Sequence, residues 1–343
     1  NLTDFPVYDL KPERTNSFEV GMNMRFLKNF ELDVTYYNAK TMNQTFNPEL
    51  PVGEYARIYI QTGAVRNQGL ELALNYNNTW KDFTWNTGVT YSMNKNKILT
   101  LADNAINPIT REKFSISSLN MGGLGSTRFI LKEGGSMGDI YSLMDLKRDA
   151  NGAVYIDENN SVVTESLEAN NYIKLGSVLP KGNLAWRNNF SWKNINVAFL
   201  VSARLGGVVF SRTQAVLDNF GVSEASAAAR DKGYVSVNGN DRVNPEGWYS
   251  VVAGGTAVPQ YYIYSATNIR LQEASIGYTI PRKWLGNVCD IKVSLIGRNL
   301  WMIYNKAPFD PESVASTDNF YQGIDYFMMP SLRNIGFNLS FKF

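Results

Sequence analysis

The stretch that decides the fold is Ile335-Gly-Phe-Asn-Leu-Ser-Phe-Lys-Phe343, at the end of the sequence. Every second residue in it is apolar, and the residues between are glycine, asparagine, serine and lysine. Successive side chains of a β-strand point to opposite faces, so this period of two predicts a strand with one apolar and one polar face. We expect Phe337, Leu339 and Phe341 to face membrane lipid.

The same alternation recurs upstream, in residues 18–26, 30–36, 70–76, 83–93, 184–192 and 195–203. Near Gln272 the phase of the alternation switches, which predicts a β-bulge. The connections fall into two classes. Tight turns are expected at 27–29, 78–82, 193–194 and 281–287, and long loops at 39–63, 97–125, 149–178, 206–260 and 304–330.

Short turns that alternate with long loops are typical of transmembrane β-barrels, which have short periplasmic turns and longer extracellular loops. Aromatic residues cluster beside the expected turns, as in the girdles at a lipid–water interface. Residues 126–148 must supply two strands or none if the alternation is to hold. A hairpin around 133–136 favours two, which gives about eleven strands. The predicted fold class is therefore all-β, a transmembrane antiparallel barrel.

Composition excludes several function classes. The chain has no histidine, which rules out Ser-His triads and His-ligated metal sites, and its lone cysteine, Cys289, cannot form an intrachain disulfide. With 33 basic and 31 acidic residues, nothing indicates nucleic acid as a partner. There is no phosphate-binding glycine loop and no isolated carboxylate pair, so we expect no enzyme, no catalytic residue and no metal site.

Several short motifs occur in a specific order along the chain. They are Leu10-Lys11-Pro12-Glu13, Asn67 with Gly69-Leu70-Glu71, Arg204 with Gly206-Gly207, Arg270-Leu271 with Gly277-Tyr278, Arg298-Asn299-Leu300, Asp310-Pro311-Glu312, and Pro330, Arg333 and Phe343. In this order they resemble the late barrel strands of SusC/RagA-type TonB-dependent transporters. A terminal aromatic such as Phe343 resembles the signal that outer-membrane assembly machinery reads.

That resemblance implies a 22-stranded barrel with an internal plug, in the outer membrane of a Gram-negative, Bacteroidetes-type bacterium. Residues 1–343 would be the C-terminal part of the barrel. The plug, the TonB-contacting segment and the signal peptide are expected outside this chain. The implied partners are a SusD-like surface lipoprotein, TonB–ExbB–ExbD, the N-terminal barrel half with its plug, and membrane lipid. The implied function is TonB-dependent import of a large nutrient, an oligosaccharide or glycan first and a peptide second.

Candidate binding residues lie in the two longest loops, where aromatic faces and amide or carboxylate groups can hold sugars or peptides above a lumen. Those expected to touch substrate or a lid are Asp218, Asn219, Trp248, Tyr249, Asp310, Tyr321, Asp325 and Tyr326. Polar residues on the inward strand faces, such as Glu71, are expected to line a hydrated wall. No cofactor is expected. Asp149 and Asp157 have calcium-like spacing but do not match the twelve-residue calcium loop, so a polar turn is favoured there.

Two other functions fit parts of the pattern. A self-contained outer-membrane porin or adhesin barrel would explain the strands, but an odd strand count and the ordered family motifs argue against it. A soluble carbohydrate-binding β-sandwich would explain the aromatic content, but the outward aromatic bands and Phe343 argue against that. The residues alone do not name the substrate.

Overall fold

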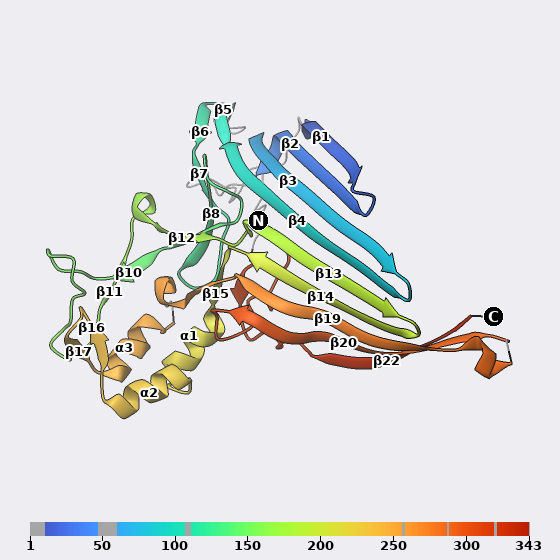
Figure 1. Ribbon diagram of the computed structural model, residues 1–343. Coiled ribbons are helices and arrows are strands. Elements are labelled where there is room, and N and C mark those ends of the chain that lie inside the picture. The colour runs from blue at the N-terminus through green and yellow to red at the C-terminus, as the bar shows by residue number, and fades with distance from the viewer. Residues whose placement is uncertain are drawn as a thin grey trace, which may run out of the picture.

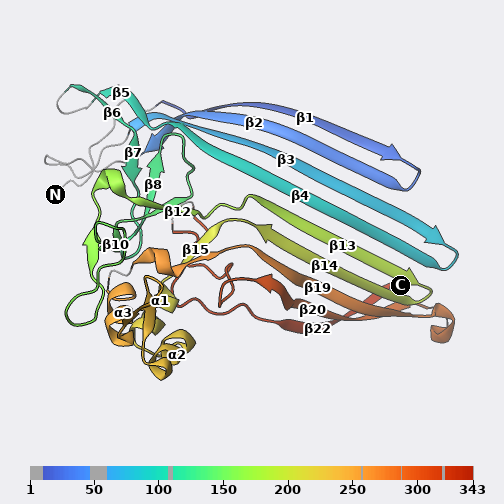
Figure 2. The ribbon, with the colours of Figure 1, turned by 60° about the vertical axis from the view of Figure 1, so that its left-hand side comes forward.

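The computed structural model describes residues 11–46, 60–106, 111–255, 258–286, 288–318 and 321–342. The expected assembly signal at Phe343 lies outside these residues. One long, twisted sheet dominates, with its turns at one end and most of the remaining chain folded at the other (Figures 1 and 2). No helix among the described residues is long and apolar enough to cross a membrane.

Over the described ranges, the large sheet has nine strands, and each pairs with its neighbours in antiparallel fashion. In spatial order these are β1 (Arg14–Phe26), β2 (Phe30–Phe46), β3 (Ile60–Trp80), β4 (Phe83–Thr100), β13 (Gly182–Trp192), β14 (Ile195–Leu205), β19 (Asn268–Ile280), β20 (Asp290–Asn305) and β22 (Asn334–Lys342). Among the described residues, β1 and β22 have only one neighbour each, so both are open edges.

Register gathers the alternating apolar residues on one face of this sheet. One row of cross-strand partners runs over seven strands through Met22, Val34, Leu72, Tyr91, Leu184, Ala203 and Ile269. Further along the sheet, Val293 pairs with Leu339 and Leu295 with Phe337. The register thus confirms that the alternating apolar residues share one face of the sheet. The ladder between β14 and β19 shifts beside Gln272, which confirms the predicted bulge.

The apolar face of the sheet remains largely uncovered. Phe337 is 81% exposed and Phe18 is 63% exposed, and Leu295 and Ile276 are each 54% exposed. A soluble protein rarely leaves so large a contiguous apolar surface open, whereas a barrel turns such a face to lipid. The outward face is therefore the lipid-facing side of a barrel wall.

The tight turns lie together at one end of the sheet (Figure 1). Trp80 pairs with Phe83 and Trp192 with Ile195, so only two residues connect the strands in each case. Lys81 and Lys193 take the left-handed conformation that such turns require, with φ of 52° and 50°. The connection from β19 to β20 is longer and contains the 3-10 turn η3 (Arg282–Leu285).

The long loops fold into a separate layer at the other end, which we call the loop domain (Figures 1 and 2). Its helical elements are α1 (Arg212–Asn219), α2 (Glu224–Lys232), α3 (Pro245–Val252), η1 (Ala169–Asn171) and η2 (Pro259–Tyr262). Its short strands are β5 (Ala102–Ile106), β6 (Lys113–Ile116), β7 (Ser118–Asn120), β8 (Thr127–Lys132), β9 (Asp139–Ser142), β10 (Met144–Leu146), β11 (Thr164–Ser166), β12 (Ile173–Ser177), β15 (Val208–Ser211), β16 (Val235–Val237), β17 (Asp241–Val243), β18 (Ile263–Ser265) and β21 (Ile324–Asp325).

The expected hairpin in residues 126–148 exists, but it does not cross the membrane. Strands β8 and β9 pair with each other and belong to a separate sheet of four strands, in the order β12-β9-β8-β7. Phe129, Ile130, Leu131 and Ile140 are at most 2% exposed, so both faces of this hairpin are covered by protein. The wall described here thus has nine strands where the sequence suggested eleven. The number of wall strands is still odd, because β8 and β9 are the two strands removed from the predicted eleven.

The buried core lies mainly in the loop domain. Its main cluster joins β8, β9, β15, α1, α3 and β21, with Phe129, Ile140, Phe210, Val252 and Ile324 each at most 2% exposed. A second cluster around Ile98 and Leu101 fastens the loop domain to the end of β4. These cores make the loop domain a folded unit that rests on the barrel wall.

Candidate functional site

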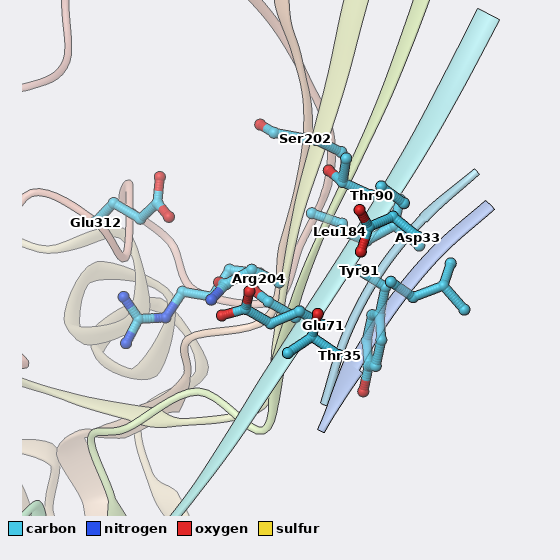
Figure 3. A pocket seen from close by; sticks show the side chains of 15 residues that line it. Asp33, Thr35, Glu71, Thr90, Tyr91, Leu184, Ser202, Arg204 and Glu312 are labelled. Carbon is cyan, nitrogen blue, oxygen red and sulfur yellow. The ribbon is translucent and has the colours of Figure 1, made fainter. Parts of the chain in front are cut away.

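The inward face of the sheet carries a polar groove with a volume of about 680 Å³ (Figure 3). Strand register builds it, because one cross-strand row runs through Thr35, Glu71, Ser92, Asn183 and Arg204. The adjacent inward row contributes Asp33, Thr90 and Ser202, and the loop after β20 contributes Glu312. The groove therefore presents carboxylates, hydroxyls, an amide and a guanidinium to one hydrated space.

The charged groups of the groove lie on two sides. Figure 3 shows Arg204 and Glu312 toward the loop domain, while Asp33 and Glu71 stay with the strands. The Nη2 group of Arg204 donates to the carbonyl of Val178 at 2.7 Å. Glu71 is exposed and forms no hydrogen bond or ion pair with any other described residue. Its carboxylate is free to bind a solute that enters the groove.

A buried ion cluster fixes the loop that carries Glu312. Arg270 of β19 points inward and is only 5% exposed. Its Nη2 atom lies 2.9 Å from Asp310 Oδ1 and 2.8 Å from Glu312 Oε2, and its Nε donates to Asn268 Oδ1 at 3.1 Å. One arginine thus holds two carboxylates from the same loop, a contact we call the Arg270 clamp.

Asp310 is fully engaged within this clamp. Burial by itself would raise its pKa, but hydrogen bonds from Arg270, Ser331 and the Glu312 amide hold the pKa of Asp310 below its usual value. The Ser331 hydroxyl donates to Asp310 Oδ2 at 2.6 Å. The structure therefore places this expected binding residue in a contact that joins the loop to β19 and to the segment before β22.

A second cavity, of about 430 Å³, lies among α1, α2 and α3 of the loop domain. Asn219, Arg230, Asn244, Glu246 and Tyr249 are among the residues that line it. Asp218 lies at its base and is 6% exposed. The Asp218 carboxylate accepts hydrogen bonds from Gln214 Nε2 at 2.9 Å, from the Tyr262 hydroxyl at 3.0 Å and from the Ser223 hydroxyl.

The buried aspartate shapes the acidity of nearby phenols. Burial, together with the negative charge of Asp218, raises the pKa of Tyr264 to about 12. The same two causes raise the pKa of Tyr262 further, and that phenol also donates a hydrogen bond to Asp218. Both tyrosines are therefore neutral at physiological pH, and Tyr262 acts as a hydrogen-bond donor within the base of the cavity.

The remaining predicted residues are dispersed over the loop domain. Trp248 packs edge-on against Tyr261, with 5.2 Å between ring centroids, and it joins the main core cluster. Asp325 is buried and accepts a hydrogen bond from the Ser211 hydroxyl at 2.6 Å. Tyr321 and Tyr326 are 43% and 49% exposed. Of the eight predicted residues, the structure brings Asp218, Asn219 and Tyr249 together around one cavity.

The two aspartates with calcium-like spacing form matching polar turns. Asp149 Oδ1 accepts hydrogen bonds from the amides of Asn151 and Ala153 at 2.8 and 3.0 Å. Asp157 Oδ1 does the same for the amides of Asn159 and Ser161, at 3.0 and 2.8 Å. Across the described ranges, no three acidic or cysteine side chains are grouped as metal ligands would be.

Sequence reasoning missed the Arg270 clamp and the role of Arg204 in the groove. Both arginines stand in the short motifs that mark strand ends, but those motifs do not show what the side chains contact. Their partners are distant in sequence, since Arg270 binds residues 40 and 42 positions away and Arg204 binds the Val178 carbonyl. Glu71 was expected to line the wall, and the structure places it there.

A family model described as "TonB dependent receptor-like, beta-barrel" matches residues 2–198. The chain belongs to this family. TonB-dependent receptors are outer-membrane transporters, which agrees with the lipid-facing apolar surface and the polar inward groove. This membership assigns the wall to the outer membrane.

Two relatives from Formosa agariphila match along nearly the whole chain. TonB-dependent receptor P3 is 26% identical over 383 residues, which cover all of this chain and 35% of that protein. TonB-dependent receptor P26 is 27% identical over 356 residues, which cover 96% of this chain and 34% of that protein. This TonB-dependent receptor chain thus spans about a third of the length of these relatives.

Among solved structures, the RagAB peptide importer in its open-open state resembles the fold with a TM-score of 0.71 and 17% sequence identity. The match covers 98% of this chain and 35% of that one. A second structure of the RagAB peptide transporter gives a TM-score of 0.70 at 16% identity. The likeness establishes a common fold for the wall and its loop domain.

Proposed function

We propose that this chain forms part of an active importer that carries a large nutrient, rich in hydrogen-bonding groups, across the outer membrane. An oligosaccharide is the first candidate and a peptide the second. The observation that carries the proposal is the inward groove, where carboxylates, hydroxyls, an amide and a guanidinium line about 680 Å³ of open space. Such convergent polar groups suit a ligand with many hydrogen-bonding groups.

The position of the groove supports this function. It lies on the polar side of the wall, beneath the loop domain, and Glu312 reaches it from a loop held by the Arg270 clamp. Glu71, which forms no hydrogen bond or ion pair with a described residue, and Arg204 contribute opposite charges to the same lining. A neutral oligosaccharide can use both as hydrogen-bonding groups, and a peptide can use both as charge partners.

The remaining parts of the proposal concern the whole protein. A plug and a TonB-contacting segment would belong to the two thirds of the relatives' length that this chain does not span. TonB–ExbB–ExbD would energise transport through that segment. A SusD-like surface lipoprotein would cover the loop domain as a lid, with Tyr321 and Tyr326 as exposed aromatic contacts.

The test begins with the gene for the full-length protein. Cells that lack it should fail to grow on one member of a panel of oligosaccharides and peptides and should regain growth when the gene is restored. Uptake of that nutrient should stop when a protonophore is added or when TonB is deleted. Uptake that survives both treatments would indicate a passive porin and would contradict active import.

The groove itself is tested with Glu71→Gln in the full-length protein. A hydrogen bond to a charged group contributes about 1.5–3 kcal/mol, so the half-saturating nutrient concentration should rise on the order of tenfold or more. Glu19→Gln is the matched control, because Glu19 is also an exposed inward carboxylate but lies on β1, outside the groove. Equal behaviour of the two variants would remove the groove from the substrate path.

A further inference from the structure

Charge is distributed unevenly on the outward face of the sheet. Over most of its area this face carries apolar and aromatic side chains, and its paired positions include no carboxylate in any of the nine strands. Its charged residues gather at the loop end of β1 to β4, and all are basic. They are Arg14, Lys40, Arg66, Lys95 and Lys97, which we call the basic rim.

Three members of the basic rim are direct cross-strand neighbours. Lys40 of β2 pairs with Arg66 of β3, and Arg66 pairs with Lys97 of β4. Side chains opposite each other in antiparallel strands have Cβ atoms about 5 Å apart, and like charges there destabilise the sheet. Among the described residues, no carboxylate forms an ion pair with any of the three, so this repulsion has no counter-charge within the described wall.

Strand geometry places the basic rim at the depth of lipid headgroups. Arg66 lies four residues before Leu70, the first member of the apolar series on β3. That separation is about 13 Å along a strand, and about 10 Å along the normal of a barrel whose strands tilt by about 40°. Lys95 is two residues from Met93, which gives about 5 Å. The headgroup layer extends about 5–8 Å beyond the hydrocarbon on each side, and long basic side chains can adjust their depth within it.

We propose that the basic rim binds the phosphate headgroup of an anionic lipid in the outer leaflet. A phosphate supplies a counter-charge to Lys40, Arg66 and Lys97, which form no ion pair with a carboxylate of the described residues. Arg66, between the two lysines, offers a planar fork of donors suited to phosphate oxygens. The adjacent apolar face receives the acyl chains. The ligand class is therefore a phosphorylated lipid, recognised by charge and depth, and the site is separate from the inward groove.

The test uses the full-length transporter, purified in detergent and titrated with dioleoyl phosphatidic acid or, for comparison, dioleoyl phosphatidylcholine. Native mass spectrometry counts the bound lipids. Wild-type protein should bind phosphatidic acid in preference to phosphatidylcholine. The triple variant Lys40→Gln, Arg66→Gln and Lys97→Gln should lose at least about tenfold in apparent affinity for phosphatidic acid, because each basic side chain adds to the attraction of an anionic headgroup.

The matched control is Lys28→Gln, Lys81→Gln and Lys193→Gln, which removes the same charge from turns at the opposite rim. It should keep phosphatidic acid binding within about twofold of wild type. Heat-modifiable migration in gels shows whether each variant is folded. If the triple variant does not fold, the single variant Arg66→Gln replaces it, and its apparent affinity for phosphatidic acid should fall about fivefold.

Three results would overturn the proposal. One is equal binding of phosphatidic acid by wild type and the triple variant, and another is an equal loss in the triple variant and its control. The third is unchanged lipid binding while the triple variant loses a copurifying acidic protein, which would make the basic rim a protein-docking surface.

Discussion

Replacing Arg270 by methionine should release the loop that carries Asp310 and Glu312 from the barrel wall. The side chains of Arg270 and Asp310 are 6% and 10% exposed, so the change leaves a buried carboxylate without its cation. Removing one partner of a buried ion pair costs about 3–5 kcal/mol. Since each 1.4 kcal/mol is a factor of ten, local opening should become between about a hundred and a few thousand times more frequent.

Amide hydrogen exchange of a peptide spanning residues 307–318 measures this opening directly. The Glu312 amide donates at 3.0 Å to Asp310 Oδ1, a carboxylate that Arg270 holds in place, and the Ala315 amide donates at 2.8 Å to the Ile324 carbonyl of β21. Both hydrogen bonds should break more often once the segment from Asp310 to Ala315 is released, so both amides should exchange faster. Arg25→Met is the matched control, because the ion pair of Arg25 with Glu31 spans 3.3 Å and Arg25 is 79% exposed. Exposed pairs contribute about 0–1 kcal/mol, so exchange there should scarcely change.

The pH dependence gives a second check on the Arg270 clamp. In wild type the pKa of Asp310 is lowered, so its contribution to stability is complete above its unfolded pKa and is lost as pH falls through the lower folded value. Without Arg270, burial favours the protonated acid, so protection in the variant should increase as pH falls from 7 toward 5. The clamp would be refuted if residues 307–318 exchanged at the same rate in Arg270→Met, in Arg25→Met and in wild type at every pH.

Three further predictions follow from the orientation of the wall. Leu339→Arg should destabilise the folded full-length barrel by roughly 2–4 kcal/mol in urea titrations, while Asn338→Lys on the inward face should be tolerated, and equal damage would contradict the facing. Protease added to intact cells should cleave within 206–260 or 304–330, whereas cleavage at Lys193 would invert the topology. Residues 1–343 expressed alone with a signal peptide should fail to give a protease-resistant, heat-modifiable monomer. The nine strands of the described wall leave β1 and β22 as edges without a second neighbour there, and these edges could meet only in parallel. A compact monomer would disprove this.

The sequence by itself determined which face of each wall strand is apolar. Alternation is a local property, because successive side chains of any strand point to opposite sides, and residues 335–341 or 70–76 therefore show their apolar face without reference to the rest of the chain. The tight turns and the bulge at Gln272 were predictable for the same reason. The ordered motifs added the family, which the match over residues 2–198 confirmed.

Only the tertiary structure decided which distant segments and side chains lie next to one another. Residues 126–148 have the pattern of a hairpin in either setting, and it was burial of Phe129 and Ile140 on both sides that placed them in the loop domain. The Arg270 clamp and the basic rim join residues that are 26 to 42 positions apart. Such contacts depend on strand register and loop path, which are set by the packing of the whole wall and leave no periodic signal in the sequence.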